Sequence, residues 1–504
     1  MTQFIKLDNS SLKQLRTVDS RLMSYNIEMT EVTGGTFWKP YTPAQIAGTE
    51  TFPPIKDMSE LPKLMQWYDP IDLTSENLLV LAKALGPVWI RVSGTWANKT
   101  YYNFEGKYAP GVIPEGFQNV LQKDQWLKLL DFVKAVDAKL LVSFANCPGI
   151  HAADEPWTPD QAKLLFDLSS EYGVPINAIE FMNEPNLLSI SGVPEGYTAA
   201  DFARDQEICN AWVKENYPDC LIVGPSTTDS DAMRMGPDDA KGGGGIADAS
   251  PTVSTAELMQ SYEVPLDVFS YHYYNGISER LASIMPDAHW KSEEAHTDAY
   301  LAMAGRCARV YSTMRDKYCP GSQMWVTESG DAGGGGSTWA PTYLDVLRTL
   351  NELGDFATVT DGIIFHNTLA SSDYGFLQHG SFNPRPNYFA VLLWNRLMGI
   401  TVYDSGIPHA EGAHVYCHSR KDDKDGCVYL VINNSLTETT TVELPKNAVR
   451  YTLSGNGDMR SSVIYLNGNP LVLGENNELP ALEGVMQDAD NVELAPGTCT
   501  FLVL

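Results

Sequence analysis

Between about residue 20 and residue 400, short apolar segments alternate with longer amphipathic ones, and this alternation constrains the fold most strongly. Eight segments have the length and nearly continuous apolar character of strands that are covered on both faces. These predicted strands are 22–28, 88–93, 139–145, 178–184, 221–226, 266–272, 324–328 and 362–367. The segments between them, such as 125–136 and 342–353, have the apolar spacing of amphipathic helices. Eight strands alternating with helices predict an α/β protein built on a closed parallel (β/α)8 TIM barrel.

An open, doubly wound parallel sheet is the alternative for such an alternation. No glycine-rich phosphate-binding motif follows the first predicted strand, so the closed barrel is favoured. After about residue 400 the pattern changes to short β-rich segments separated by turn residues, which indicates an antiparallel β-sandwich. We therefore predict a barrel over 17–398, a β-sandwich over 399–504, and an N-terminal segment, 1–16, that adds a strand to the sandwich.

The charge and the cysteines limit the possible partners and the compartment. The chain has 504 residues and a formal net charge of −28. So negative a surface argues against nucleic acid, anionic membranes and long sulfated polysaccharides as partners. The first residues lack the apolar segment of a secretory signal, no run is long enough to span a membrane, and the eight cysteines lack metal-ligand spacing. These features predict a cytoplasmic protein with free thiols; a disulfide between Cys417 and Cys427 across a hairpin is the alternative.

Two glutamates, Glu184 and Glu328, stand at the ends of strongly apolar predicted strands. In a parallel barrel the C-terminal strand ends form the active-site face. A glutamate there is either solvated in a cleft or paired. The fourth and seventh strands lie across the barrel mouth from each other, so both carboxylates can face one ligand. Hydrolysis of a glycosidic bond requires such a pair, one group to protonate the leaving oxygen and one to attack the anomeric carbon.

The motif around the first glutamate is Asn183-Glu184-Pro185-Asn186. An asparagine directly before an acid/base glutamate can bind the sugar 2-hydroxyl, a contact that strengthens in the transition state. The motif also occurs by chance, and a surface glutamate in a turn before Pro185 is the alternative. The position after a core strand, matched by Glu328, favours catalysis.

Further motifs follow one another along the chain. They are IRVSGT (90–95), EFMNEPN (180–186), SYHYYNG (270–276), WVTESGDAGGGG (325–336) and the segment 373–399. Their order and spacing resemble glycoside hydrolase family 79, the family of heparanase and the β-glucuronidases, over nearly the whole chain. The resemblance implies a retaining barrel glycosidase that needs no cofactor and no metal ion.

The resemblance also implies roles for individual residues. Glu184 would be the acid/base and Glu328 the nucleophile, with Asn183 holding the sugar 2-hydroxyl and Tyr274 or His272 supporting the nucleophile. The remaining substrate contacts that it implies are Glu28 and Thr95 for the far hydroxyls, and Gly334, Gly335 and Tyr374 for a uronate carboxylate.

Three features have two interpretations each. The glycine run 333–336 lets backbone N–H groups converge on an anion without any Lys or Arg, and a flexible linker is the alternative. Arg91, at the end of the second strand, either orients the nucleophile, which is favoured, or only pairs a buried acid. The second glycine run, Gly242–Gly245, is either a linker or a lid over the active site.

Taken together, the sequence predicts an exo-acting β-glucuronidase that releases terminal glucuronic acid from small β-glucuronides with retention. The alternatives are a retaining glycosidase that acts on a neutral sugar, a heparanase-like endo-glucuronidase, and a non-catalytic carbohydrate-binding barrel. The absence of a run of basic residues argues against the endo-acting enzyme, and the presence of both glutamates argues against the binding protein. The oligomeric state is not predicted.

Overall fold

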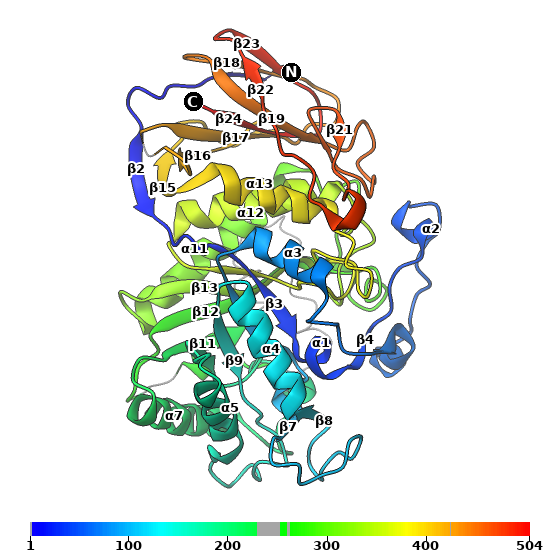
Figure 1. Cartoon of the computed structure of the whole chain (residues 1–504), viewed down its shortest axis with the longest axis vertical. Coiled ribbons are helices and arrows are strands. Elements are labelled where there is room, and N and C mark those ends of the chain that lie inside the picture. The colour runs from blue at the N-terminus through cyan, green and yellow to red at the C-terminus, as the bar shows by residue number, and fades with distance from the viewer. Residues whose placement is uncertain (1–2, 229–251, 260–262, 424) are drawn as a thin grey trace.

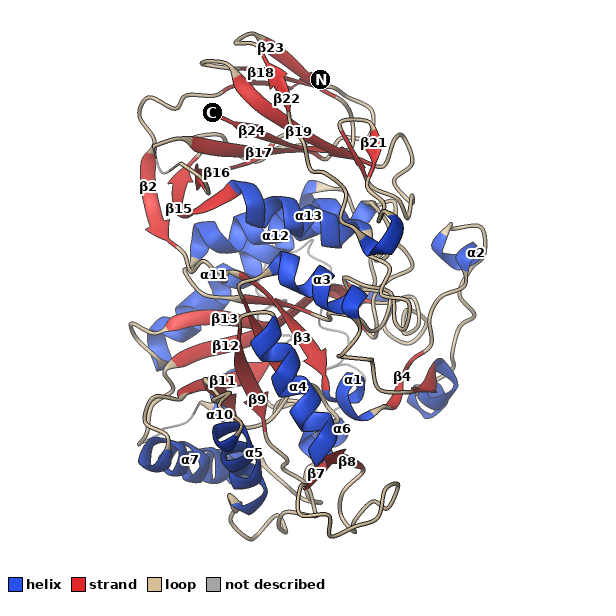
Figure 2. Cartoon of the chain, viewed as in Figure 1, coloured by secondary structure: helices blue, strands red, loops and turns tan. Residues whose placement is uncertain are grey.

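A computed structural model of the chain contains a barrel and a β-sandwich arranged along the long axis of the molecule (Figure 1). The structure describes residues 3–228, 252–259, 263–423 and 425–504. Helices α12 (Leu344–Val359) and α13 (Pro386–Leu397) lie between the barrel and the sandwich, and the N- and C-terminal ends are both in the sandwich (Figure 2). The close fit at this boundary is visible at Gly354 of α12, where any added Cβ would lie 2.4 Å from the Tyr416 ring of the sandwich.

Eight parallel strands close the barrel in the order β10-β11-β12-β13-β14-β3-β6-β9. In chain order they are β3 (Met23–Glu28), β6 (Val88–Ser93), β9 (Ala138–Ser143), β10 (Ala178–Glu180), β11 (Leu221–Thr227), β12 (Val268–Ile277), β13 (Gln323–Gly333) and β14 (Ile364–His366). The predicted (β/α)8 barrel is confirmed, and the open-sheet alternative is wrong because the strands form a closed cycle. Each of the eight predicted strands overlaps one of these. The ends differ most at β10, which stops before Glu184, and at β13, which continues beyond Glu328.

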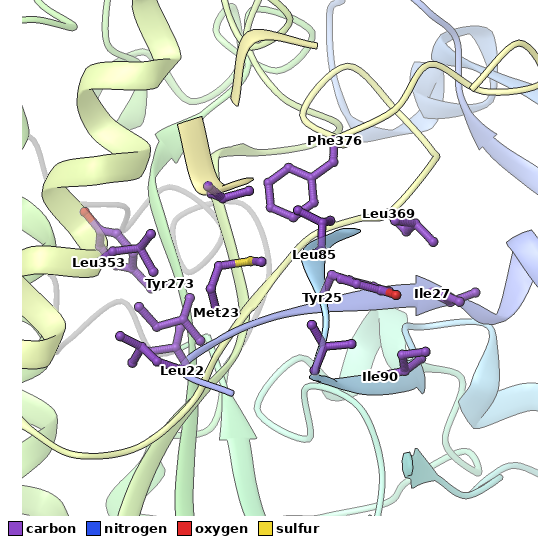
Figure 3. Close-up of a cluster of buried hydrophobic side chains, with 14 of the residues drawn as sticks. Leu22, Met23, Tyr25, Ile27, Leu85, Ile90, Tyr273, Leu353, Leu369 and Phe376 are labelled. Carbon is purple, nitrogen blue, oxygen red and sulfur yellow. The ribbon is translucent and has the colours of Figure 1, made fainter. Parts of the chain in front are cut away.

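Helices surround the barrel strands. The longer ones are α3 (Glu76–Leu85), α4 (Lys123–Ala135), α5 (Asp160–Glu171), α7 (Ala199–Asn216) and α11 (Asp298–Tyr318), and the short ones are α1 (Met29–Thr33), α6 (Leu188–Ser191) and α10 (Thr255–Leu258). Helix α2 (Pro43–Ile46) lies away from the barrel, on the excursion that follows α1 (Figure 1). The outward side chains of the strands pack against them: Figure 3 shows Tyr25 and Ile27 of β3 among the buried side chains, together with Leu85 of α3 and Leu353 of α12. In the described part of the chain, no helix has both the length and the apolar character needed to cross a bilayer.

The barrel interior has an apolar floor and a polar upper layer. Along β6, Ile90 packs outward with the helices while Trp89 joins the floor, as the period-two alternation of a strand requires. The floor consists of Trp89, Leu141, Ala178, Val223, Val268, Trp325, Ile363 and Phe365. Two residues further along β6, Arg91 is on the same inner side as Trp89 and is fully buried. The interior is therefore filled up to the level where the strands end, and the open space lies above it.

The β-sandwich consists of two sheets. The larger has the order β2-β15-β16-β17-β24-β19-β20-β21, with β22 beside β19, and the smaller has the order β1-β18-β23. The bounds are β1 (Gln3–Lys6), β2 (Lys13–Thr17), β15 (Met398–Asp404), β16 (His414–Arg420), β17 (Cys427–Asn433), β18 (Thr440–Glu443), β19 (Ala448–Ser454), β20 (Tyr465–Leu466), β21 (Asn469–Pro470), β22 (Val485–Gln487), β23 (Asn491–Leu494) and β24 (Thr498–Val503). The N-terminal segment gives this region two strands: β1 pairs parallel with β18, and β2 pairs antiparallel with β15.

Several excursions extend the barrel mouth. After α1, strands β4 (Gly35–Trp38) and β5 (Met65–Tyr68) form an antiparallel pair, with the 3-10 helix η1 (Met58–Leu64) before β5. After β6, the 3-10 helix η2 (Ala97–Lys99) leads into a second pair, β7 (Thr100–Asn103) and β8 (Asn119–Gln122). The glycine run Gly242–Gly245 lies outside the described residues. All eight cysteines are buried free thiols, as expected.

Candidate active site

The two glutamates reach the barrel mouth through local departures from regular structure. Glu184 follows β10 with a backbone φ of 46°, which is rare for a residue with a side chain. In β13 the register against β12 shifts between two pairs, Tyr271 with Val326 and His272 with Glu328, so that Thr327 is the extra residue. Such a bulge re-aims the following side chain. Glu328 consequently points into the mouth instead of toward the surrounding helices.

His272, on β12, lies between the two glutamates. Its Nδ1 atom is 3.1 Å from Oε1 of Glu184 and 3.5 Å from Oε2 of Glu328. One oxygen of each carboxylate and one nitrogen of the ring all lie within 4.8 Å of one another. Both carboxylates can therefore contact the same glycosidic bond.

Glu328 is almost completely buried and strongly hydrogen bonded. Its Oε1 accepts from Nη1 of Arg91 at 3.0 Å, and its Oε2 accepts from the Tyr274 hydroxyl at 2.7 Å. Burial alone would raise the pKa of Glu328, but His272, Arg91 and the Tyr274 hydrogen bond together hold that pKa below its usual value. Glu328 is therefore an anion at neutral pH.

Arg91 contacts both Glu328 and a second buried acid, and its role toward the nucleophile stays a prediction. It forms a buried ion pair with Glu180 at 2.6 Å in addition to its contact with Glu328. Its Nη2 atom also donates to Oδ1 of Asn183 at 2.7 Å and lies 3.3 Å from Nε2 of His272. Because a guanidinium only donates, Nε2 is the acceptor and the ring proton of His272 is on Nδ1. That proton is directed at the two glutamates.

Asn183 is held from two sides. Its backbone N–H donates to Oδ1 of Asn98 at 2.8 Å, and Nδ2 of Asn98 donates to its carbonyl at 3.0 Å. Since Arg91 occupies the amide oxygen, the amide NH2 of Asn183 is turned toward Glu184, 3.4 Å from its Oε2, and lines the cavity. Asn98 was not predicted from the sequence; its position in the loop after β6 gave no signal.

A cavity of about 370 Å³ opens above the two glutamates. The sequence-predicted residues that line it are Glu28, Thr95, Asn183, Glu184, Tyr274, Glu328, Gly334 and Tyr374. Arg91 and His272 instead form the layer behind the glutamates. Gly335 lies beneath Trp38, whose Cγ would be 2.8 Å from any Cβ added there. The structure thus brings eight of the eleven predicted residues to one surface.

The glycine turn after β13 is fixed from the side of a buried arginine. Gly334, Gly335 and Gly336 have φ values of 87°, 88° and 85°, which favour glycine. Nη1 of Arg280 donates to the carbonyls of Gly334 at 3.1 Å and Gly336 at 2.9 Å, and the Asp373 N–H donates to the carbonyl of Gly335 at 3.1 Å. Arg280 and Asp373 are themselves an ion pair at 2.6 Å. These contacts fix the conformation of the turn, so it is not a flexible linker.

Tyr374 lies with its backbone against this turn, where a Cβ added to Gly336 would be 2.9 Å from the Tyr374 nitrogen, and its side chain lines the cavity. Nδ2 of Asn367 donates to the hydroxyl of Tyr374 at 3.1 Å and to that of Tyr274 at 2.9 Å. Burial raises the pKa of Tyr374, so its hydroxyl is protonated near neutral pH. The proton is available to a ligand in the cavity. Asn367 stands at the end of the last barrel strand. This position is the signal by which the sequence could have identified it as a site residue.

Glu28 has the opposite electrostatics to Glu328. Burial, and then the negative charge of Glu328, raise the pKa of Glu28 well above its usual value. The raised pKa favours the protonated carboxyl of Glu28, which is the form that can donate to a sugar hydroxyl. Its place is secured by Gly94, where an added Cβ would lie 1.6 Å from Oε2 of Glu28.

Comparison with known proteins places the chain in a family. No protein-family model matches the sequence. The chain is 30% identical over 481 residues to baicalin-β-D-glucuronidase from Scutellaria baicalensis, which covers 86% of this chain and 84% of the relative. The chain belongs to glycoside hydrolase family 79. It is therefore an enzyme, a glycoside hydrolase, and the predicted family is confirmed.

Other family 79 relatives match over a similar length. Heparanase-like protein 1 from Arabidopsis thaliana is 24% identical over 492 residues, covering 86% of this chain and 85% of the relative. Heparanase from Bos taurus is 23% identical over 498 residues, covering 86% and 84%. Among solved structures, a 4-O-α-L-rhamnosyl-β-D-glucuronidase from Fusarium oxysporum superimposes with a TM-score of 0.63 at 13% identity over 100% of both chains. That likeness supports the fold.

One cluster in the described part of this family 79 enzyme has the geometry of metal ligands, namely Glu184, His272 and Glu328. The Arg91 guanidinium lies 3.0 Å from Glu328, and its positive charge would repel a cation bound among these atoms. The charge of Glu328 is already compensated by that guanidinium. The absence of a metal or cofactor requirement stays a prediction.

Proposed function

We propose that this glycoside hydrolase is a retaining exo-β-glucuronidase that releases terminal glucuronic acid from small β-glucuronides. The observation that carries the proposal is the pair of carboxylates that meet at His272, with Glu328 kept ionised by Arg91 and Tyr274. Retaining enzymes keep their two carboxyl groups roughly 5–5.5 Å apart, whereas inverting enzymes leave room for a water between them at about 6.5–9.5 Å. An oxygen-to-oxygen approach within 4.8 Å favours retention.

The reaction would proceed in two displacements. Glu328 attacks the anomeric carbon while Glu184 gives its proton to the glycosidic oxygen, and the aglycone leaves as an alcohol. Glu184, now a carboxylate, then takes a proton from a water that attacks the same carbon, and the bond to Glu328 breaks. The amide NH2 of Asn183 lies where it can hold the 2-hydroxyl during both steps.

The choice of a uronic acid rests on the glycine turn and on Tyr374. The three carbonyls of Gly334 to Gly336 are engaged by Arg280 and Asp373, and the Gly336 N–H donates to the carbonyl of Ala332 at 3.1 Å. Gly334 lines the cavity, so its N–H group is the donor of the turn that we assign to the carboxylate. The Tyr374 hydroxyl supplies a further donor in the same cavity. Donors of this kind suit a carboxylate. The name of the Scutellaria relative, a β-D-glucuronidase, agrees with this choice.

A panel of 4-nitrophenyl β-glycosides tests the proposal. We expect turnover of the glucuronide and little or none of the glucoside and xyloside, with the β-anomer of glucuronic acid as the first product in NMR spectra. Faster hydrolysis of a neutral glycoside would contradict the uronic acid assignment. Release of the α-anomer would contradict retention.

A further inference from the structure

The cavity has two chemically different regions. Its polar residues gather around the glutamates, where one sugar would be bound. The rest of its wall is apolar and is made of Phe37, Trp38, Met58, Leu61, Met65, Trp96, Leu187, Ile190, Ile277, Leu281 and Met285. We call these eleven residues the apolar wall. A wall of this kind is more than one sugar requires.

One part of the apolar wall is carried by the same turn as Glu184. The N–H of Leu187 donates to the carbonyl of Glu184 at 3.0 Å, and Ile190 follows in α6 with 42% of its surface exposed. An acid that protonates the leaving oxygen lies beside the aglycone. Leu187 and Ile190 therefore flank the place where the aglycone leaves.

Another part comes from the β4–β5 excursion and from the loop after β12. Met58 and Leu61 are half-buried, and they pack with Ile277, Leu281 and Met285 in a small hydrophobic cluster that is separate from the main core. These side chains are supported from behind, so the wall is built before any ligand binds. Methionine is the side chain that adapts best to ligands of different shape.

Trp96 connects the two parts. Its indole N–H donates to the carbonyl of Thr36 at 3.0 Å, so the polar atom of the ring is satisfied within the protein. The ammonium of Lys99 lies 5.1 Å from the centre of the Trp96 ring, and Lys99 is the only cation among the described residues that line the cavity. The indole thus offers an apolar surface and no hydrogen bond to a ligand.

A second sugar would fit this wall badly. Each pyranose ring brings several hydroxyl groups, and a hydroxyl that loses water without gaining a partner costs roughly 1–3 kcal/mol. An apolar aglycone loses no hydrogen bonds there and gains from the burial of its own surface. The difference in free energy favours the apolar aglycone.

We infer that the part of the apolar wall beside Glu184, formed by Leu187, Ile190 and Trp96, is an aglycone subsite for apolar alkyl or aromatic alcohols and not for a further sugar. This inference rests on the proposed glucuronidase function, because it assigns the group on the other side of the bond that the enzyme cleaves. It makes the protein a deconjugating enzyme whose substrates are glucuronides of hydrophobic alcohols.

The experiment measures kcat/KM for alkyl β-glucuronides from methyl to hexyl, whose leaving groups have similar basicity. We expect kcat/KM to rise roughly two- to fourfold for each added methylene, as for partial to full burial of each group. A disaccharide with glucuronic acid linked to a second sugar should be a poorer substrate than the hexyl compound. A flat alkyl series, or a preference for the disaccharide, would overturn the inference while leaving the glucuronidase function intact. Failure to cleave any of these glucuronides would instead contradict the proposed function itself.

Ile190→Asn tests the location, since an exposed residue tolerates this change without unfolding. The variant should lower kcat/KM for the hexyl glucuronide at least threefold, and should lower that for the methyl compound less. Met58→Gln, from the part of the wall that packs beside the glycine turn, should change the methyl and hexyl values to the same extent. Ile400→Asn is the matched control, because Ile400 lies on β15 in the sandwich with 37% of its surface exposed. Equal losses on the methyl and hexyl compounds in Ile190→Asn would show that the aglycone does not contact the part of the wall beside Glu184.

Discussion

Among single residues, the protonation of three glutamates decides what the mouth can do. Glu328 has three positive or donating groups around it, which favour its charged form, whereas the burial of Glu28 beside that charge raises the pKa of Glu28 and favours its protonated form. Glu184 is less enclosed than either, and its near partners are His272 and Asn183. Three glutamates that lie close together therefore have three different functions: one is an anion, one favours the form that donates a hydrogen bond, and one is exposed to the cavity.

The two glutamates proposed as catalytic should respond differently to loss of their carboxylates. Glu328→Gln should reduce kcat by at least about 10⁴-fold on every glucuronide, because no covalent intermediate can form. Glu184→Gln should lose about 10²–10⁴-fold on alkyl glucuronides but far less on 2,4-dinitrophenyl glucuronide, whose leaving group needs no proton. Steady-state kinetics on both substrates, with circular dichroism as the folding control, make the comparison. If the two variants were equally impaired on the activated substrate, the assigned roles would be wrong.

Removal of the Tyr274 hydroxyl should change the pH profile. Tyr274 donates to Glu328 and helps to hold its pKa below the usual value, so the ionised form persists to lower pH. Activity should therefore fall as the pH falls through this lowered pKa. In Tyr274→Phe the pKa rises, and the acid limb of the kcat/KM profile should move to higher pH. Tyr273→Phe is the control: the Tyr273 hydroxyl donates to Asn275, so its loss should leave the limb in place. If the acid limb did not move in Tyr274→Phe, the Tyr274 hydroxyl would not control the pKa of Glu328.

Tyr374→Phe tests the recognition of the uronate. The variant should lose about 1.5–3 kcal/mol of binding to a charged acceptor, or roughly 10- to 150-fold in kcat/KM for 4-nitrophenyl glucuronide. Any residual turnover of 4-nitrophenyl glucoside should be affected far less, because the glucoside has no carboxylate. The ratio of the two kcat/KM values is the measurement. Equal losses on both sugars would mean that Tyr374 does not contact the acid group.

At the scale of the elements, the sequence reveals where strands run but not how they depart from regularity. Nearly continuous apolar runs located all eight barrel strands, since a strand covered on both faces has no polar side. The bulge at Thr327 and the positive φ of Glu184 depend on pairing partners far away in the chain, so no local pattern encodes them.

In the candidate site, too, the sequence identifies some residues and not others. The strand-end rule chose Glu184, Arg91 and Glu328 because each ends an apolar run. The rule could not identify Arg280, which holds the glycine turn in place, or Trp38, which covers Gly335. Both residues contact partners more than 50 residues away in the sequence. Side chains on long excursions are positioned by tertiary packing, and only the structure reveals which of them reach the cavity.

The turn after β6 gives a prediction at this scale. Gly94 has a φ of 90°, and an added methyl group would overlap Oε2 of Glu28. Gly94→Ala should lower kcat/KM at least tenfold and destabilise the fold by more than the roughly 1 kcal/mol that a left-handed alanine costs. Gly106→Ala is a matched control, since Gly106 also has a positive φ, 69°, but an added Cβ meets nothing within 4 Å. Kinetics and thermal unfolding of both variants separate overlap from backbone strain. If the two variants behaved alike, Glu28 would not depend on the space at Gly94.

Across the whole molecule, the sandwich and the barrel share a large apolar boundary. Nearly every residue of α12 is buried, because the helix is covered by the barrel on one side and by sandwich strands on the other. The N-terminal strands close the same region, so the chain begins and ends in the sandwich (Figure 1). The sandwich also reaches the excursion after α1, where Nη1 of Arg460 donates to the carbonyl of Ile46 at 2.8 Å. The shape of the barrel mouth is set by the excursions after the barrel strands.

The net charge of −28 gives the last prediction, which separates exo from endo action. An endo-acting enzyme on a sulfated chain would need cations along an open cleft, whereas Lys99 is the only cation lining the described part of this cavity. Salt screens the repulsion between the acidic protein and an anionic substrate, and it equally weakens any attraction of a polyanion to basic residues. Turnover of 4-nitrophenyl glucuronide between 50 and 500 mM NaCl should accordingly stay constant or rise slightly, by less than about threefold. Size-exclusion chromatography of heparan sulfate after incubation should show an unchanged chain length. Mid-sized fragments that appear at low salt and disappear at high salt, with little free glucuronic acid, would identify an endo-acting enzyme instead.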